Sequence, residues 1–273
     1  MTDDADPIAG LLDEELGALS ALGHELAEPD WDVPTALPGW TVKDCFSHVV
    51  ETERTLAGDP ASEAAVDHLA HVERPFQQFT EPGVEARRRL RGPEVLAQLD
   101  EVWPRRIAAL SAMTPAELDV VGWSPIGEVA HRDFMAVRVF DIWMHEQDVR
   151  RALGRPGHET GPAPDRALDR FRAAVPFVVG KKAGAPDGSS VVFRCTGANP
   201  LVLPIVVEGR ARVVDVADAP ADPTVTLTLP FGAFVALGGG RWTADEARAA
   251  GGVEVAGDVE LGERILAGMA FTP

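Results

Sequence analysis

The sequence predicts a fold of the α plus α+β class, in which a helical N-terminal domain precedes a mixed C-terminal domain. Apolar residues recur with a helical period as far as residue 154, whereas a period of two prevails beyond residue 190. A segment rich in proline and glycine, RPGHETGPAP, separates the two patterns. The chain has 273 residues, which is enough for two domains. We therefore expect residues 1–155 to form one domain and residues 163–273 to form the other.

The first domain is expected to contain four main helices. The second of them begins at Thr41, where Asp44 three residues later completes a capping box. Pro104 should kink or split the third helix. Helices with apolar stripes that are joined by loops form a helical bundle. The four expected helices cover residues 5–28, 42–57, 92–113 and 131–154.

The segments between these helices carry weaker signals. WDVPTALPGW, at residues 31–40, has two prolines and a glycine and is expected to be irregular. Residues 61–72 are expected to form a short helix on which His68 and His71 are exposed to solvent and do not form a metal pair. The basic run at residues 87–91 is expected on a solvated face, and residues 123–127 in a loop.

The second domain alternates between strand and helix patterns. Gly209-Arg210 is expected to close a hairpin. The three glycines at residues 238–240 do not form a dinucleotide fingerprint, because they do not follow a strand that opens onto a helix. The expected strands are residues 190–195, 201–208, 211–216, 224–229 and an edge strand at 253–255, and the expected helices are residues 163–180, 231–237 and 260–270.

Composition excludes several classes of partner. The formal net charge is −18, which disfavours binding to nucleic acid and to anionic membrane surfaces. No apolar run reaches the length of a transmembrane helix, and the acidic start MTDDADP does not resemble a signal peptide. The two cysteines, Cys45 and Cys195, form neither a disulfide framework nor a zinc-finger spacing. We expect a cytoplasmic protein with free thiols, and the oligomeric state stays open.

The helix expected at residues 131–154 has an unusual face. Phe134, Val137, Met144 and Ala152 define an apolar stripe. At 100° per residue, the ionisable side chains of three other residues fall on the same face of the helix as that stripe, and that of Arg138 lies slightly further round. The three are Asp141, His145 and Asp148.

Two interpretations of this polar stripe are open. Asp141 and His145 are four residues apart, so a carboxylate and an imidazole on adjacent turns can bind one divalent metal ion. Alternatively, Asp141 pairs with Arg138 and His145 pairs with Asp148 in a buried ion-pair network, which an isolated D-x-x-x-H pattern favours. A third ligand elsewhere in the chain would favour the metal.

Four stretches resemble the mycothiol-dependent maleylpyruvate isomerase family. They are LPGW at 37–40, TVKDCFSHVVETE at 41–53, WMHEQDVRRALGRP at 143–156 and VEVAGDVELGERILAGMAFTP at 253–273. The resemblance implies a DinB-like four-helix bundle followed by a domain similar to a sterol carrier protein. It also implies a metal site formed by His48, Asp141 and His145, with Asp141 in place of the family's glutamate. The resemblance leaves the reaction open.

The implied function is that of a metal-dependent enzyme that uses the thiol cofactor mycothiol. Zinc is the expected metal, because three nitrogen and oxygen ligands leave a fourth position open, as in catalytic zinc sites. The expected reaction is either cis–trans isomerisation of an unsaturated dicarboxylate or transfer of the thiol to an electrophile. Arg241, which follows the three glycines, is the candidate catalytic residue outside the metal site, as an anion clamp in the cleft between the domains. Asp148 is expected to orient His145. The rival interpretation is a non-enzymatic ligand-binding or regulatory protein on the same fold.

Overall fold

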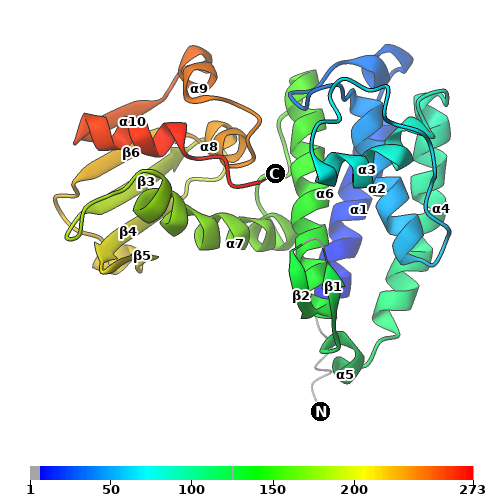
Figure 1. Cartoon of the computed structure of the whole chain (residues 1–273), viewed down its shortest axis with the longest axis horizontal. Coiled ribbons are helices and arrows are strands. Elements are labelled where there is room, and N and C mark those ends of the chain that lie inside the picture. The colour runs from blue at the N-terminus through cyan, green and yellow to red at the C-terminus, as the bar shows by residue number, and fades with distance from the viewer. Residues whose placement is uncertain (1–6, 125, 273) are drawn as a thin grey trace. The chain divides into compact units, whose positions relative to one another are not determined.

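The computed structural model describes residues 7–124 and 126–272 and divides into two compact units (Figure 1). The first unit is Met1–Ala167 and the second is Leu168–Pro273. The boundary between the units falls inside helix α7, Pro162–Phe177. Each unit has its own core and is described by itself.

The first unit is the predicted four-helix bundle. It consists of α1 (Ile8–His24), α2 (Val42–Leu56), α4 (Gly92–Ser111) and α6 (His131–Leu153). Helix α2 packs against α4 and α6, and α1 packs against the same two helices (Figure 1). Helix α4 runs through Pro104 as a single helix, so the proline does not split it. Helix α6 ends at Gly154, whose left-handed backbone (φ 63°) forms the C-cap.

The apolar stripe predicted for α6 is shifted in the structure. Val137 is only partly buried, whereas Met135, Val139, Ile142 and Val149 contribute to the core of the bundle. Every residue from 142 to 149 is buried, including the polar ones. The middle of α6 is therefore enclosed on all sides, and its ionisable side chains need partners within the protein.

Four local predictions for the first unit are wrong in whole or in part. Residues 61–72 contain no helix, and the short helix lies later, as α3 (Pro75–Glu85). Two short strands, β1 (Val121–Ser124) and β2 (Gly127–Ala130), form an antiparallel hairpin around the expected loop at residues 123–127, of which Pro125 is outside the described residues. Arg87 is buried and not solvated, because it donates hydrogen bonds to Glu51, Gln98 and the carbonyl oxygen of Gly83. His71 is also largely buried, whereas the side chain of His68 is 62% exposed, as expected.

The first unit also contains the 3-10 helix η1 (Glu28–Asp32) and the short helix α5 (Pro115–Leu118). Among the described residues, no helix combines the length and the apolar character that crossing a membrane requires.

The second unit has a five-stranded sheet in the order β5-β4-β3-β6-β7. Strands β3 and β6 are parallel, and every other neighbouring pair is antiparallel. The predicted hairpin joins β4 to β5, and the last strand lies at an edge as expected. The strands are β3 (Ser190–Thr196), β4 (Val202–Glu208), β5 (Arg210–Val213), β6 (Val225–Pro230) and β7 (Glu254–Gly257).

Helices α8 (Phe231–Gly238) and α10 (Val259–Ala267) pack against strands of this sheet. Phe171 of α7, Phe193 of β3 and Phe234 of α8 lie in contact and form an aromatic centre for the unit. The second unit also contains the π-helix η2 (Val178–Lys182), the 3-10 helix η3 (Val216–Asp218) and α9 (Ala244–Ala250), which was not predicted. This arrangement confirms the α+β class.

Candidate metal centre

Helices α2 and α6 bring three potential metal ligands together inside the bundle. The capping box at Thr41 fixes the start of α2, since Asp44 accepts hydrogen bonds from the backbone and the hydroxyl group of Thr41. His48 follows about two turns later. Asp141 and His145 lie one turn apart on α6, so their side chains project from the same face. The ligand atoms of His48, Asp141 and His145 all lie within 4.8 Å of one another.

Both imidazoles direct their Nε2 atoms at the carboxylate of Asp141. The Nε2 atom of His48 lies 3.1 Å from Asp141 Oδ2, and that of His145 lies 3.7 Å from Asp141 Oδ1. The two imidazole rings meet edge to face, with their centroids 4.8 Å apart. A tetrahedral ion with ligands at about 2.1 Å separates neighbouring ligand atoms by about 3.4 Å. The two observed spacings bracket that value, so these side chains fit a metal ion of this kind with small adjustments.

The environment sets the protonation states that metal binding needs. Burial lowers the pKa of His48, although Asp141 acts in the opposite direction, so the imidazole is neutral at neutral pH. Burial alone would raise the pKa of Asp141, but the positive charge of Arg138 and the neighbouring histidines hold it well below the ordinary value. The site therefore presents a neutral nitrogen ligand and an ionised carboxylate at neutral pH.

A buried network of ion pairs holds the carboxylate of Asp141 in place. Arg138 pairs with Asp141 and donates a second bond, from its Nε atom, to Glu53 Oε1 at 2.9 Å. Glu53 is completely buried, and its other oxygen accepts a bond of 2.8 Å from Arg106. Two arginines thus balance Glu53 and Asp141, and the network is electrically neutral. Because removal of one partner would strand a buried charge, this network holds α2, α4 and α6 in register.

Asp148 lies on the far side of His145. Its Oδ2 atom is 3.4 Å from the Nδ1 atom of His145, and its Oδ1 atom pairs with Arg151 at 3.1 Å. The Nδ1 atom of His145 is buried and has no hydrogen-bond partner among the described residues. A small rotation of either side chain would create the carboxylate–histidine pair that commonly orients a metal-binding imidazole.

The indole ring of Trp40 packs against both histidines. Its centroid lies 5.4 Å from that of His48 and 5.5 Å from that of His145. The Nε1 atom of Trp40 donates a 2.8 Å hydrogen bond to Glu81 of α3. The carbonyl oxygen of Trp40 accepts hydrogen bonds from Thr35. The loop at residues 33–40 therefore covers the site with a residue, Trp40, whose side chain and backbone are both held by hydrogen bonds.

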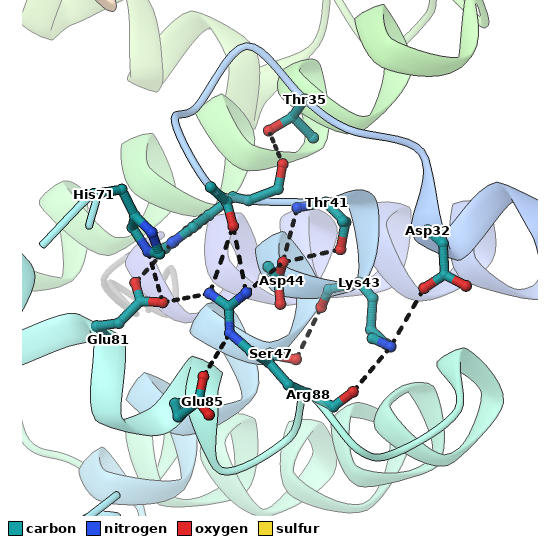
Figure 2. Close-up of polar contacts among 12 residues, drawn as sticks. Asp32, Thr35, Thr41, Lys43, Asp44, Ser47, His71, Glu81, Glu85 and Arg88 are labelled. Carbon is teal, nitrogen blue, oxygen red and sulfur yellow. Dashed lines mark hydrogen bonds and ion pairs between the residues drawn. The ribbon is translucent and has the colours of Figure 1, made fainter. Parts of the chain in front are cut away.

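Glu81 organises this loop. Its buried carboxylate also accepts a bond of 3.0 Å from His71 and a bond from Arg88, which in turn pairs with Glu85 (Figure 2). Arg88 further donates to the carbonyl oxygen of Gly39, next to Trp40. Sequence reasoning missed Trp40, Glu81 and Glu53 as parts of the site. The one signal available in the sequence for Trp40 was the LPGW stretch, which is among those that carry the family resemblance. In the structure the glycine before the tryptophan has a positive φ (Gly39, φ 76°).

Both interpretations of the polar stripe find their contacts in the structure. The pairs Arg138–Asp141 and His145–Asp148 belong to the ion-pair network, and His48 adds the third ligand that the metal site needs. Arg241 belongs to the second unit, where its guanidinium donates a hydrogen bond to the carbonyl oxygen of Gly239. Cys45 and Cys195 are free and buried.

Comparisons with known proteins agree with this architecture. Residues 12–150 match the family described as the mycothiol maleylpyruvate isomerase N-terminal domain, and residues 181–267 match the SCP-2 sterol transfer family. No curated protein matches the chain significantly in sequence.

Two solved structures share the fold. One is a mycothiol-dependent maleylpyruvate isomerase, with a TM-score of 0.55 and 14% identity over 91% of both chains. The other is a histidine-to-alanine mutant of such an enzyme, with a TM-score of 0.54 and 14% identity over the same shares. At this identity the likeness establishes the fold of the chain alone.

Proposed function

Because the chain belongs to the mycothiol maleylpyruvate isomerase family, we propose that it is a metal-dependent enzyme that uses mycothiol as its thiol cofactor. Its reaction is either cis–trans isomerisation of an unsaturated dicarboxylate or transfer of the thiol sulfur to an electrophile. The metal ligands are His48, Asp141 and His145, and zinc is the proposed metal.

The observation that carries this proposal is the position of His48. An ion-pair network on α6 needs Arg138, Asp141, His145 and Asp148, all of which lie within ten residues or so of one another. It does not need a buried histidine 93 residues away whose Nε2 atom lies 3.1 Å from Asp141. Burial of a second imidazole against the same carboxylate supports a single metal ion that all three side chains bind.

A divalent cation in such a site lowers the pKa of a bound thiol and so supplies a thiolate nucleophile near neutral pH. The protein's own groups prepare that chemistry. His48 and His145 offer Nε2 atoms, Arg138 keeps Asp141 ionised and fixed, and Trp40 shields the imidazoles from water.

Charge balance supports an anionic cofactor or substrate. Arg106 and Arg138 balance Glu53 and Asp141, so the site is neutral before a cation enters. A thiolate or a dicarboxylate would balance the charge of the cation. Arg241 is the proposed anion clamp. Both free cysteines fit the reducing cytoplasm in which we place the protein.

Asp141 is the residue that distinguishes this chain from the pattern implied by its family resemblance. Aspartate is one methylene shorter than glutamate, and we propose that its pairing with Arg138 places the carboxylate for binding. The difference bears on the choice of substrate more than on the presence of metal. A ligand-binding or regulatory protein on the same fold is the alternative function.

An assay with mycothiol tests the proposal. The zinc-loaded full chain would be incubated with mycothiol and maleylpyruvate, and separately with a panel of electrophiles. Isomerisation would be followed by absorbance, and S-conjugates by mass spectrometry. We expect turnover in the wild type and its loss in Asp141→Ala, with the fold retained. Turnover that is equal in Asp141→Ala, or that does not require mycothiol, would contradict the proposal.

The control for that variant is Asp133→Ala. Asp133 lies in the first turn of the same helix and is exposed, so its removal should leave metal binding and turnover unchanged. If replacing His48, Asp141 or His145 changes stability only, the alternative function is supported.

A further inference from the structure

A second cluster of metal-ligating side chains lies elsewhere in the first unit. It consists of Glu15 on α1, Glu146 on α6 and His158 on the loop after α6. One potential ligand atom from each residue lies within 4.8 Å of the others. The Nδ1 atom of His158 is 2.7 Å from Glu146 Oε2 and 4.0 Å from Glu15 Oε1. The proposed function makes no use of these residues.

Glu15 is the most unusual member of the cluster. Its side chain is completely buried, and neither carboxylate oxygen has a hydrogen-bond partner among the described residues. An ionised carboxylate in such a place is very unfavourable without a compensating charge. Two unpaired oxygens that face an imidazole and a second carboxylate therefore indicate a missing cationic partner.

The charges around Glu15 do not balance. If all three are ionised, Glu14, Glu15 and Glu146 carry three negative charges, whereas Arg150 supplies one positive charge through its 2.7 Å contact with Glu146 Oε1. His158, which also lies 3.5 Å from Glu14, adds at most one more. With all three carboxylates ionised, at least one negative charge is left over around the buried Glu15, and only the partly exposed Glu14 can be screened by water. The site formed by His48, Asp141 and His145 differs in this respect, because arginines neutralise it.

His158 is held in place by its backbone. It has a left-handed conformation (φ 50°), which is uncommon for residues other than glycine. Its carbonyl oxygen accepts a 2.9 Å hydrogen bond from Trp143 and a longer one from Gln147, both on α6. These bonds fix the loop against α6 and keep the imidazole beside the two glutamates.

We propose that Glu15, Glu146 and His158 form a second metal site, which binds a divalent transition-metal ion. Two carboxylates and one imidazole are ligands that zinc, manganese and iron accept. A bound ion needs neighbouring ligand atoms about 3–3.5 Å apart, so His158 and Glu146 must separate by a few tenths of an ångström. Glu146 follows His145 directly in the sequence, about 100° around α6, so the two sites lie on different faces of one helix. The ion at this second site stabilises the attachment of the loop to α1 and α6.

The competing explanation is that a proton, and not a metal ion, neutralises Glu15. Burial and the nearby charges of Glu146 and Glu14 raise the pKa of Glu15 to about 10 when no cation is present. The two explanations differ in stoichiometry. A proton-only site predicts that Glu15→Gln leaves metal binding unchanged, since the neutral amide resembles the protonated acid. A metal site predicts that the same variant loses one ion.

Titration of the metal-free full chain with Zn²⁺ by calorimetry separates these outcomes. We expect about two equivalents per chain for the wild type, about one for Glu15→Gln, about one for His145→Ala and none for the double variant. A wild type whose single equivalent is lost in His145→Ala and retained in Glu15→Gln would overturn the proposal, as would a Glu15→Gln variant that binds as many equivalents as the wild type. Loss of an ion in Glu15→Gln without loss in His145→Ala would instead contradict the metal site of the proposed function alone.

Control variants distinguish the loss of a metal ligand from the effects of substitution or misfolding in general. Glu25→Gln, at the exposed end of α1, should bind as the wild type does. His158→Gly removes the imidazole but keeps a residue that adopts positive φ without strain, and it should also lose one equivalent. Circular dichroism would verify that each variant is folded. If Glu15→Gln does not fold, His158→Gly gives the deciding stoichiometry.

Discussion

At the scale of single residues, His145 shows how the environment determines a role. One of its ring nitrogens faces Asp141 at 3.7 Å and the other faces Asp148 at 3.4 Å. The imidazole thus lies between a carboxylate that would share its proposed metal ion and a second carboxylate, whose proposed role is to orient it. The proposed role of Asp148 is to orient the imidazole of His145 through this contact.

We predict that Asp148→Asn weakens metal affinity by about 10–100-fold, as loss of a residue that orients a metal ligand does elsewhere. The asparagine keeps the shape of the side chain and removes its charge. Competition with a chromogenic chelator would measure the affinity. Because Asp148 also pairs with Arg151, Arg151→Gln serves as the control that breaks this pair and leaves His145 untouched. If Arg151→Gln weakens binding as much as Asp148→Asn, Asp148 does not act through His145.

The cysteines allow a prediction on pH dependence. Burial raises the pKa of the Cys195 thiol from 9.0 to about 12. The reactive form is the thiolate, and a shift of three units lowers its fraction at pH 8 about a thousandfold. We therefore expect iodoacetamide to leave Cys195 unmodified in the native protein at pH 8, with modification increasing only as the pH approaches 12 or the protein unfolds. Mass spectrometry of the alkylated chain would measure this, and rapid labelling of the native protein at pH 8 would contradict it.

At the scale of elements, the ends of the helices could be read from the sequence more easily than the short elements between them. The capping box at Thr41 and the glycine after α6 are local signals, and both lie where expected. Helix α3 was missed because its sequence, PFQQFTEPGVE, contains two prolines and lacks a clear apolar period. Tertiary hydrogen bonds from Trp40, His71 and Arg88 to Glu81 hold it in place, and no local pattern encodes them.

The candidate site shows the same limit. The spacing of residues along α6 predicted which of its side chains share a face. It did not predict which residue of α2 would lie against that face. That pairing depends on the register between two helices far apart in sequence, which the network of Glu53, Arg106 and Arg138 fixes in the structure. His48 became a candidate through the family resemblance and not through its own surroundings in the sequence.

Two glycines in the first unit give a matched test of backbone conformation. Gly154 has a positive φ of 63°, and Gly10 lies in α1 with helical geometry, while neither has an atom that would obstruct an added Cβ. We predict that Gly154→Ala lowers the free energy of unfolding by about 1–2 kcal/mol. Gly10→Ala should raise it by about 0.5–1 kcal/mol. Urea unfolding would measure both, and a stabilising Gly154→Ala would contradict the assigned C-cap.

At the scale of the whole molecule, the chain joins two units with different architectures. The bundle carries both clusters of potential metal ligands, and the α+β unit carries Arg241. The net charge of −18 makes each buried cation more favourable, since a strongly acidic protein repels itself. The central claim, that His48, Asp141 and His145 hold a metal ion, concerns the first unit and can be tested without knowing the substrate.

The most direct test is the metal content of the purified full chain, measured by elemental mass spectrometry for the wild type, His145→Ala and His24→Ala. His24 is 62% exposed and pairs with Asp100 on the surface, so its replacement controls for the loss of any histidine. We predict that His145→Ala contains about one divalent ion per chain fewer than the wild type, while His24→Ala contains the same amount. Equal metal content in the wild type and His145→Ala, after reconstitution with Zn²⁺, would contradict the claim and leave the three residues as an ion-pair network.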